Sequence, residues 1–169
     1  MRKVQRHAMR RKTAAVCRAT DEVLCVSIPK IIHYCWFGGG PISEADRKCM
    51  ESWKKYCPDY KIIEWNEQNF EISANRYAQQ AYEAKKYAFV SDYVRLAVVY
   101  EYGGIYLDTD VELVRPLDEL LELPGFMGFQ NNNEVATGLG FGACKGNPVV
   151  QALLRDYDAL DFIKADGSV

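Results

Sequence analysis

The stretch FVSDYVRLAVVYEYGGIYLDTDVELV, from Phe89 to Val114, decides the fold of this chain. Its first half has the composition of a helix, and the pair Gly103–Gly104 predicts the end of that helix, because glycine readily adopts the conformations that terminate helices. The apolar residues from Ile105 onward predict a strand. The tight turn between them predicts that the helix folds back beside the strand.

The strand is expected to run from Ile105 to Val114 and to carry two aspartates on one face. Residues two apart in a strand share a face, so Tyr106, Asp108 and Asp110 should point the same way. The Cα atoms of the two aspartates would then be ~6.6 Å apart. Carboxylates at this spacing repel each other unless a cation lies beside them. Because Mg²⁺ and Mn²⁺ take one or two carboxylates and complete their coordination with water and phosphate oxygens, Asp108 and Asp110 are predicted metal ligands.

The preceding helix is expected to bring Asp92 and Arg95 to the same place. Ser91 is the predicted N-cap, with Asp92 in the first turn, and the spacing of three places Asp92 and Arg95 on one helix face. The planar guanidinium of Arg95 suits a phosphate, whereas Asp92 can accept hydrogen bonds from sugar hydroxyls. Ligands of open α/β sheets bind at the carboxyl ends of strands, which is where the two aspartates stand.

The remaining elements alternate between strands and helices, which predicts an α/β layered sheet. Ser43 and Asn147 are predicted N-caps, and Pro148 takes the first helical position of the last helix. The expected strands are 28–37, 60–66 and 125–130, the expected helices are 43–56, 74–88 and 147–160, and a short helical turn is expected at 116–123.

Composition and charge limit the class of protein. The 169 residues suit one domain, and 49% hydrophobic and 26% charged residues are ordinary globular values. The first 20 residues hold seven Lys or Arg and no acid, while the whole chain has a net charge of −2, so the remainder carries −9. An acidic body argues against nucleic acid as the main partner. The six cysteines form no CxxC pair, which favours reduced thiols in a cytoplasmic protein.

The basic residues 1–26 are interpreted as a disordered N-terminal extension. They lack the apolar core of a signal peptide, and no stretch of the chain is long enough to span a membrane. Three interpretations stay open: a disordered arm, a weak contact with anionic lipid on the inner face of the membrane, and an upstream extension from a misplaced start codon.

The segment SDYVRLAVVYEYGGIYLDTD resembles the signature of glycosyltransferase family 32, whose sugar-binding region contains a DXD motif. The family includes yeast-type α-mannosyltransferases and bacterial capsular polysaccharide enzymes. IPKIIHYCWFGGGP, from Ile28 to Pro41, resembles the opening strand of the same family, and the likeness runs to about Tyr157. Residues 27–169 are therefore expected to be one glycosyltransferase domain with a GT-A-like, Rossmann-type fold and a mixed, mostly parallel sheet.

The resemblance implies a retaining enzyme that moves a hexose from a UDP- or GDP-sugar to a saccharide or glycan acceptor with Mn²⁺ or Mg²⁺. It implies that Trp36 stacks near the nucleobase and that Asp92 and Arg95 contact sugar, ribose and phosphate. It also implies that Asp108 contacts sugar and ribose near the metal and that Asp110 ligates the metal. The chain stops at FIKADGSV, before the C-terminal part that helps relatives close the site, so the domain is expected to be truncated.

Two other functions remain as alternatives. A phosphohydrolase with Asp108 as nucleophile would also place DxD after an apolar strand, although Glu112 stands where such motifs usually have Thr or Val. A non-catalytic fragment could bind nucleotide sugar without turnover. GLGFGA, from Gly138 to Ala143, fits a dinucleotide loop formally, but it lacks the preceding strand and the helix opening within it. Its glycines are therefore assigned to turns or to close backbone approach.

Overall fold

A computed structural model describes residues 27–131 and 134–164. The predicted extension 1–26 lies outside these residues. The core is a five-stranded mixed sheet with strand order β2-β1-β3-β7-β4. β1 (Ile31–Cys35) pairs in parallel with β2 (Lys61–Trp65) and β3 (Gly104–Tyr106), whereas β7 (Phe141–Ala143) is antiparallel to both β3 and β4 (Gly125–Met127). The α/β prediction is confirmed.

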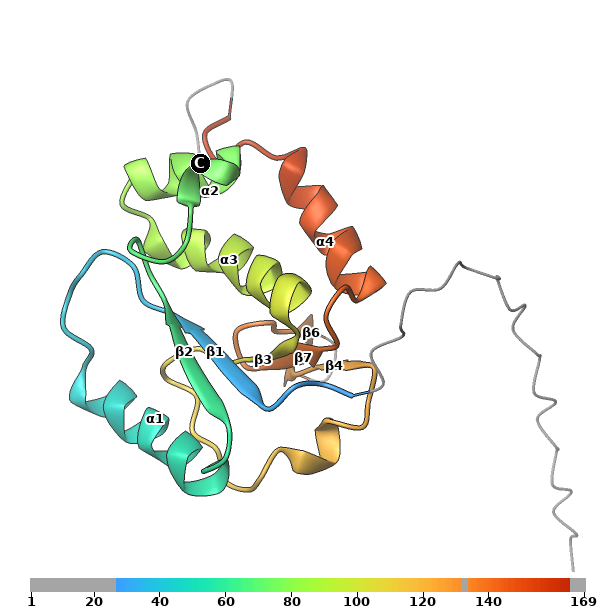
Figure 1. The fold of residues 1–169 in the computed structure, drawn as a ribbon. Coiled ribbons are helices and arrows are strands. Elements are labelled where there is room, and N and C mark those ends of the chain that lie inside the picture. The colour runs from blue at the N-terminus through green and yellow to red at the C-terminus, as the bar shows by residue number, and fades with distance from the viewer. Residues whose placement is uncertain (1–26, 132–133, 165–169) are drawn as a thin grey trace, which may run out of the picture.

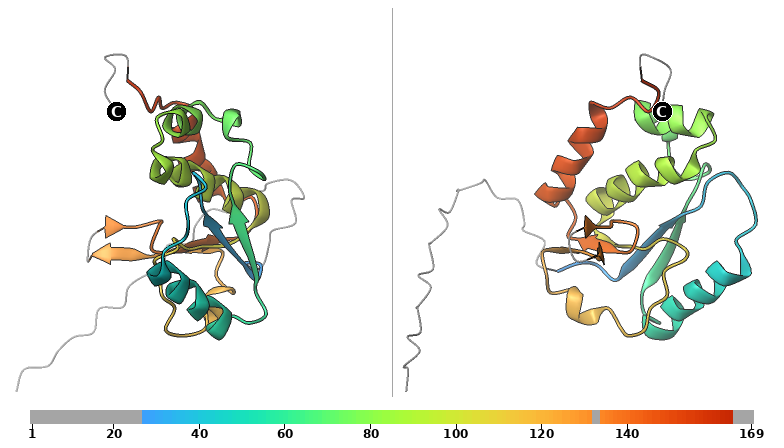
Figure 2. Two further views of the ribbon diagram at one scale, coloured as in Figure 1. Left: turned by 90° about the vertical axis from the view of Figure 1, so that its left-hand side faces the viewer. Right: turned by 180° about the vertical axis from the view of Figure 1, so that it is seen from behind.

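Helices cover both faces of this sheet (Figures 1 and 2). α1 (Glu44–Tyr56) lies on one side, where Trp53 packs in a core with Ile32 and Ile105. α2 (Arg76–Glu83), α3 (Tyr87–Tyr102) and α4 (Pro148–Asp158) lie on the other, where Val94 and Phe141 share a second core. The fold therefore has three layers, with the most apolar helix, α3, directly over the sheet.

The predicted caps of α1 and α4 are confirmed. Ser43 accepts a hydrogen bond from the Asp46 amide at 3.0 Å, and Asn147 accepts from the amides of Val149 and Val150. Each cap satisfies backbone donors that the first turn leaves unpaired. The predicted turn near 116–123 is the 3₁₀ helix η2 (Asp118–Leu120), and a second one, η1 (Ile72–Ala74), precedes α2.

The prediction of Ser91 as N-cap is wrong. α3 begins at Tyr87 after Lys86, so Ser91 and Asp92 lie in its second turn, and the Ser91 hydroxyl donates to the Tyr87 carbonyl at 3.1 Å. The predicted helix 74–88 is also too long. Lys85 has φ 57°, its amide bonds to the Tyr82 carbonyl, and the next amide bonds to that of Ala81. This Schellman arrangement ends α2 and lets α3 start in a new direction.

The predicted end of α3 is confirmed. Gly103 caps the helix with φ 68°, and Gly104 has φ 110°, conformations that favour glycine. A Cβ on Gly104 would lie 2.8 Å from Nε2 of His33 in β1, so the close approach of β3 to β1 also requires glycine.

The predicted strand 105–114 is much shorter in the structure. β3 ends at Tyr106, and Asp108 to Val111 form a turn in which the Val111 amide donates to the Asp108 carbonyl at 3.1 Å. The two aspartates therefore lie in a turn beyond the strand, so the ~6.6 Å spacing of a regular strand does not apply to them. They still stand at the carboxyl end of β3.

One further expectation about a strand is wrong, and one strand was not expected. The predicted strand 125–130 breaks at Gly128, giving β4 and then β5 (Phe129–Asn131), which forms a separate hairpin with β6 (Glu134–Val135). The glycine-rich segment 138–143, assigned to turns or to close backbone approach, includes part of a turn at 137–139 and then β7, an interior strand of the main sheet that the sequence did not predict. The Phe126 ring of β4 lies where a Cβ on Gly142 of β7 would be, so glycine at this position makes room for that ring.

Within 27–131 and 134–164, no helix is long and apolar enough to cross a membrane. In the same ranges no disulfide forms, and the four cysteines there are thiols, as the sequence predicts for this part of the chain.

Candidate functional site

The candidate site lies where the carboxyl ends of β1 and β3 meet α3. Two clefts adjoin there, and Arg95, Asp108 and Asp110 line both of them. The first, called the Trp36 cleft, has a volume of about 440 Å³ and runs toward Trp36 and Tyr87. The second, called the Leu139 cleft, has a volume of about 630 Å³ and is walled by residues 135–139. The three residues chosen from the sequence therefore form the boundary between two open spaces.

Arg95 is the buried positive charge of this site. Only 7% of the residue is exposed, and its guanidinium lies 2.6 Å from Asp92 and 3.9 Å from Asp108. Nε donates to the Ser91 carbonyl at 3.1 Å, and the guanidinium carbon lies 5.1 Å from the centre of the Tyr106 ring. Burial opposes the charge, but the neighbouring acidic groups outweigh it and the pKa of Arg95 is raised. Arg95 therefore presents a fixed, permanent cation to both clefts.

Asp108 is held in one orientation from two sides. The Tyr106 hydroxyl donates to its Oδ1 at 2.9 Å, and its own amide donates to the Gly138 carbonyl at 3.0 Å. Tyr106 is 1% exposed, and burial raises its pKa well above the ordinary value. The phenol is therefore a permanent hydrogen-bond donor, and Asp108 keeps its second oxygen for other partners.

Asp110 differs from Asp108 because its carboxylate is exposed. It has no hydrogen bond or ion pair with any residue in the described ranges. One carboxylate held in place and one unpaired carboxylate, both bordering an open cleft, fit a divalent cation that draws its other ligands from phosphate and water. Within residues 27–131 and 134–164, no group of three or more His, Cys, Asp or Glu could hold a metal ion. Any metal bound here would therefore depend on ligands beyond these side chains.

Asp92 is brought to Arg95, as predicted, but it borders neither cleft. Burial raises the pKa of Asp92, and the positive charge of Arg95 opposes this rise without cancelling it. Asp108 adds to this rise because a second negative charge disfavours ionisation. The structure thus places Asp92 behind Arg95, where it orients the guanidinium.

Trp36 lies in the loop after β1 and is half-buried. Its indole N–H donates to the Gly40 carbonyl at 2.7 Å, which closes the glycine loop around it. Gly38, with φ 84°, has the Tyr87 ring where a Cβ would be. The half-buried Trp36 ring lines this cleft together with Asp108 and Arg95, so it is available to a flat group bound there.

The wall formed by residues 135–139 was predicted only in part: Gly138 was assigned to a turn or to close backbone approach, but the rest of the wall carried no prediction. Thr137 accepts a long hydrogen bond from Nη1 of Arg95 at 3.4 Å, and Gly138 lies against Asp108. No local signal places these residues at the site, because they reach it through the pairing of β7 with β3. Cys35 also borders the Trp36 cleft, but burial raises its pKa to about 12, so the thiol stays protonated.

The profile described as "Glycosyltransferase sugar-binding region containing DXD motif" matches residues 43–126, a range that includes Asp92, Arg95 and both aspartates. The chain belongs to this family of glycosyltransferases, whose sugar-binding region contains a DXD motif.

Several relatives resemble the chain. Inositol phosphoceramide mannosyltransferase 3 of Schizosaccharomyces pombe is 31% identical over 144 residues, which are 80% of this chain and 39% of the relative. Human alpha-1,4-N-acetylglucosaminyltransferase is 34% identical over 67 residues, 40% of this chain and 18% of the relative. The chain therefore spans well under half the length of these relatives.

A solved structure supports the fold. The PaToxG glycosyltransferase superposes with a TM-score of 0.62 over 76% of this chain and 59% of its own, at 22% identity. At that identity the likeness bears on the fold alone.

Proposed function

We propose that this chain carries the donor site of a metal-dependent, retaining hexosyltransferase with a GT-A-like, Rossmann-type fold. The observation that carries the proposal is the junction of the two clefts. A buried arginine, a fixed carboxylate and an unpaired carboxylate meet there, and the aromatic ring of Trp36 lines one of the two clefts. A nucleotide sugar has parts that suit these groups: a flat base, a ribose, a diphosphate and a hexose.

Each residue has a role that its surroundings support. Trp36 stacks on the nucleobase, an interaction worth ~1–3 kcal/mol per base. Arg95 binds the diphosphate, and because Asp92 and the Ser91 carbonyl hold its guanidinium, little reorganisation is needed when the ligand arrives. Asp108 accepts hydrogen bonds from sugar or ribose hydroxyls, while its Tyr106 bond keeps it in place.

The fission of the bond between sugar C1 and the diphosphate leaves negative charge on the leaving oxygen. Arg95 stabilises that charge as it develops, because it is close, permanently charged and partly shielded from water. Mn²⁺ or Mg²⁺ bound by Asp110 and Asp108 would supply Lewis-acid stabilisation of the same oxygens. The acceptor, a saccharide or glycan, would enter by the Leu139 cleft, which shares the two aspartates.

A donor screen tests the proposal. Calorimetry with UDP-glucose, UDP-galactose and GDP-mannose, with and without Mn²⁺, should show metal-dependent binding of at least one donor. Slow hydrolysis of the same donor should follow, since water can replace the acceptor. Binding without turnover would favour the non-catalytic fragment. Release of phosphate from small phosphoesters, without nucleotide-sugar binding, would favour the phosphohydrolase.

A further inference from the structure

The wall of the Leu139 cleft passes directly over the Asp108 carboxylate. At Gly138 an added Cβ would lie 2.1 Å from Oδ2 of Asp108 and 2.9 Å from Nη1 of Arg95. Real Cβ atoms do not approach other atoms as closely as the first of these distances. The space that a side chain would fill at this position is therefore the space that the Asp108 carboxylate occupies.

The backbone requirement at Gly138 is one of space and not of conformation. Gly140, two residues on, has φ 148°, a value that favours glycine, whereas Gly138 is not among the residues with positive φ. An alanine at 138 could adopt the same backbone conformation. The neighbouring carboxylate is the obstacle.

Asp108 has no easy way to move aside. Its Oδ1 accepts from the buried Tyr106 hydroxyl, and its amide is bonded to the carbonyl of Gly138 itself. Rotation of the carboxylate would leave the Tyr106 hydroxyl without its partner inside the core, which is unfavourable. Retreat of the loop would break the hydrogen bond from the Asp108 amide to the Gly138 carbonyl, and it would pull Thr137 away from Arg95. Either response displaces a group that would face the diphosphate in the proposed function.

We propose that Gly138 is a positioning residue for the donor site: by lacking a side chain, it lets the cleft wall lock the Asp108 carboxylate and the Arg95 guanidinium in their binding orientation. The role assigned to the site rests on the proposed function; the steric claim does not. The wall continues into the hairpin, where the Ala136 amide donates to the Gly128 carbonyl at 2.9 Å. Gly138 thus connects the wall of the Leu139 cleft to the Asp108 carboxylate of the proposed donor site.

The first test is Gly138→Ala, measured by calorimetry with Mn²⁺ and the donor that the parent binds best. Loss of outer-shell support typically weakens a metal site 10- to 100-fold, and a fall in donor affinity of about this size is expected. Unchanged affinity would overturn the proposal.

The second test needs no ligand, and it separates this proposal from the proposed function. Gly138→Ala should lower the thermal midpoint of the metal-free protein, and at least half of that fall should vanish in an Asp108→Ala background, where the obstructing carboxylate is gone. An equal fall in both backgrounds would show that Gly138 matters to the loop alone, and would overturn the claim. If the parent binds no nucleotide sugar, the proposed function fails, but this comparison still decides whether Gly138 positions Asp108.

Discussion

Asp110→Asn is the substitution that tests the metal assignment most directly. Asparagine has nearly the same size, but it lacks the charge that holds a divalent cation beside a diphosphate. Asp110 is exposed and makes no hydrogen bond or ion pair with the described residues, so the metal-free fold should change by no more than ~0.5 kcal/mol. The effect of the substitution is therefore confined to binding.

The expected magnitude follows from the coupling between binding and folding. A ligand at 100 times its Kd stabilises the folded state by ~2.7 kcal/mol. For a domain of this size each kcal/mol raises the thermal midpoint by ~2–4 °C, so the parent should gain roughly 5–11 °C with saturating Mn²⁺ and nucleotide sugar. Asp110→Asn should lose most of that gain, while its midpoint without ligand stays close to that of the parent.

Glu112→Gln is the matched control, because Glu112 is an exposed carboxylate that lines the same Leu139 cleft. It should keep the metal-dependent gain. Thermal unfolding of the three proteins, with and without Mn²⁺ and the nucleotide sugar, measures both quantities. If Asp110→Asn gains as much as the parent, Asp110 is not a ligand and the metal assignment is wrong. If the variant unfolds without ligand, Asp110 has a structural role instead.

Three further substitutions probe the groups around the site. Arg95→Lys keeps the charge but loses the planar fork that reaches Asp92 and the Ser91 carbonyl together. Chemical denaturation should therefore show a free energy of unfolding lower by ~1–3 kcal/mol, and calorimetry should show weaker donor binding. Equal donor affinity would place Arg95 outside the diphosphate site. Tyr106→Phe removes a hydrogen bond to a carboxylate and should cost ~1–3 kcal/mol in urea unfolding, with weaker Mn²⁺-dependent binding; parental affinity would show that Asp108 needs no such support. Burial, aided by the charge of Lys61, lowers the pKa of His33, so below pH ~6.5 the unfolded chain binds a proton that the folded chain does not. The free energy of unfolding should therefore decrease as the pH is lowered, by at most ~1.4 kcal/mol per pH unit, until the folded pKa is reached. His33→Gln should have a flatter profile between pH 5.5 and 7. Equal slopes for the two proteins would contradict this origin.

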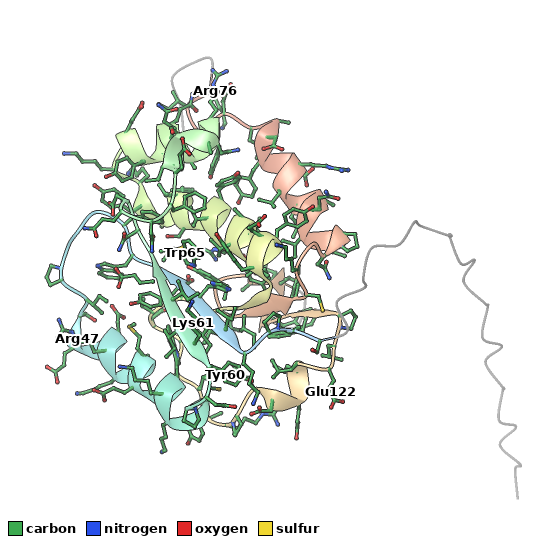
Figure 3. The ribbon with its side chains drawn as sticks, viewed as in Figure 1. Arg47, Tyr60, Lys61, Trp65, Arg76 and Glu122 are labelled. Atoms are coloured by element: carbon green, nitrogen blue, oxygen red, sulfur yellow. The ribbon has the colours of Figure 1, made fainter. Side chains whose placement is uncertain are left out.

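The hydrogen bonds of His33 explain why its neutral form is favoured. Nε2 contacts the Gly103 carbonyl at 2.8 Å and must donate, while Nδ1 lies 3.0 Å from the Trp65 indole N–H and must accept. Trp65, labelled in Figure 3, also stacks on Tyr102 of α3. A protonated imidazole would set two N–H donors against each other at Trp65, so the ring ties β1, β2 and the end of α3 together only while it is neutral.

The elements that the sequence predicted correctly carry their signals locally. Ser43 and Asn147 satisfy amides within their own first turns, and Gly103 closes α3 by its own conformation. The start of α3 was misplaced because its true boundary depends on Lys85, a residue that rarely adopts a positive φ. Packing contributes to this boundary, since Val90 in the first turn of α3 is fully buried in the core, although Ala88 and Phe89 beside it are exposed.

The candidate site shows the same division between local and distant information. Asp92, Arg95, Asp108 and Asp110 lie within 19 residues of sequence, so a helix, a turn and a short strand are enough to bring them together. Gly138 lies 30 residues beyond Asp108 in sequence and reaches it because β7 returns antiparallel to β3. With three residues, β7 is too short for periodicity to reveal it, and the sequence could assign Gly138 to a turn or to close backbone approach without indicating which group it approaches. The residues that bind a ligand can thus be recognised by their chemistry, whereas the residue that keeps them in place becomes visible only when the chain has folded over them.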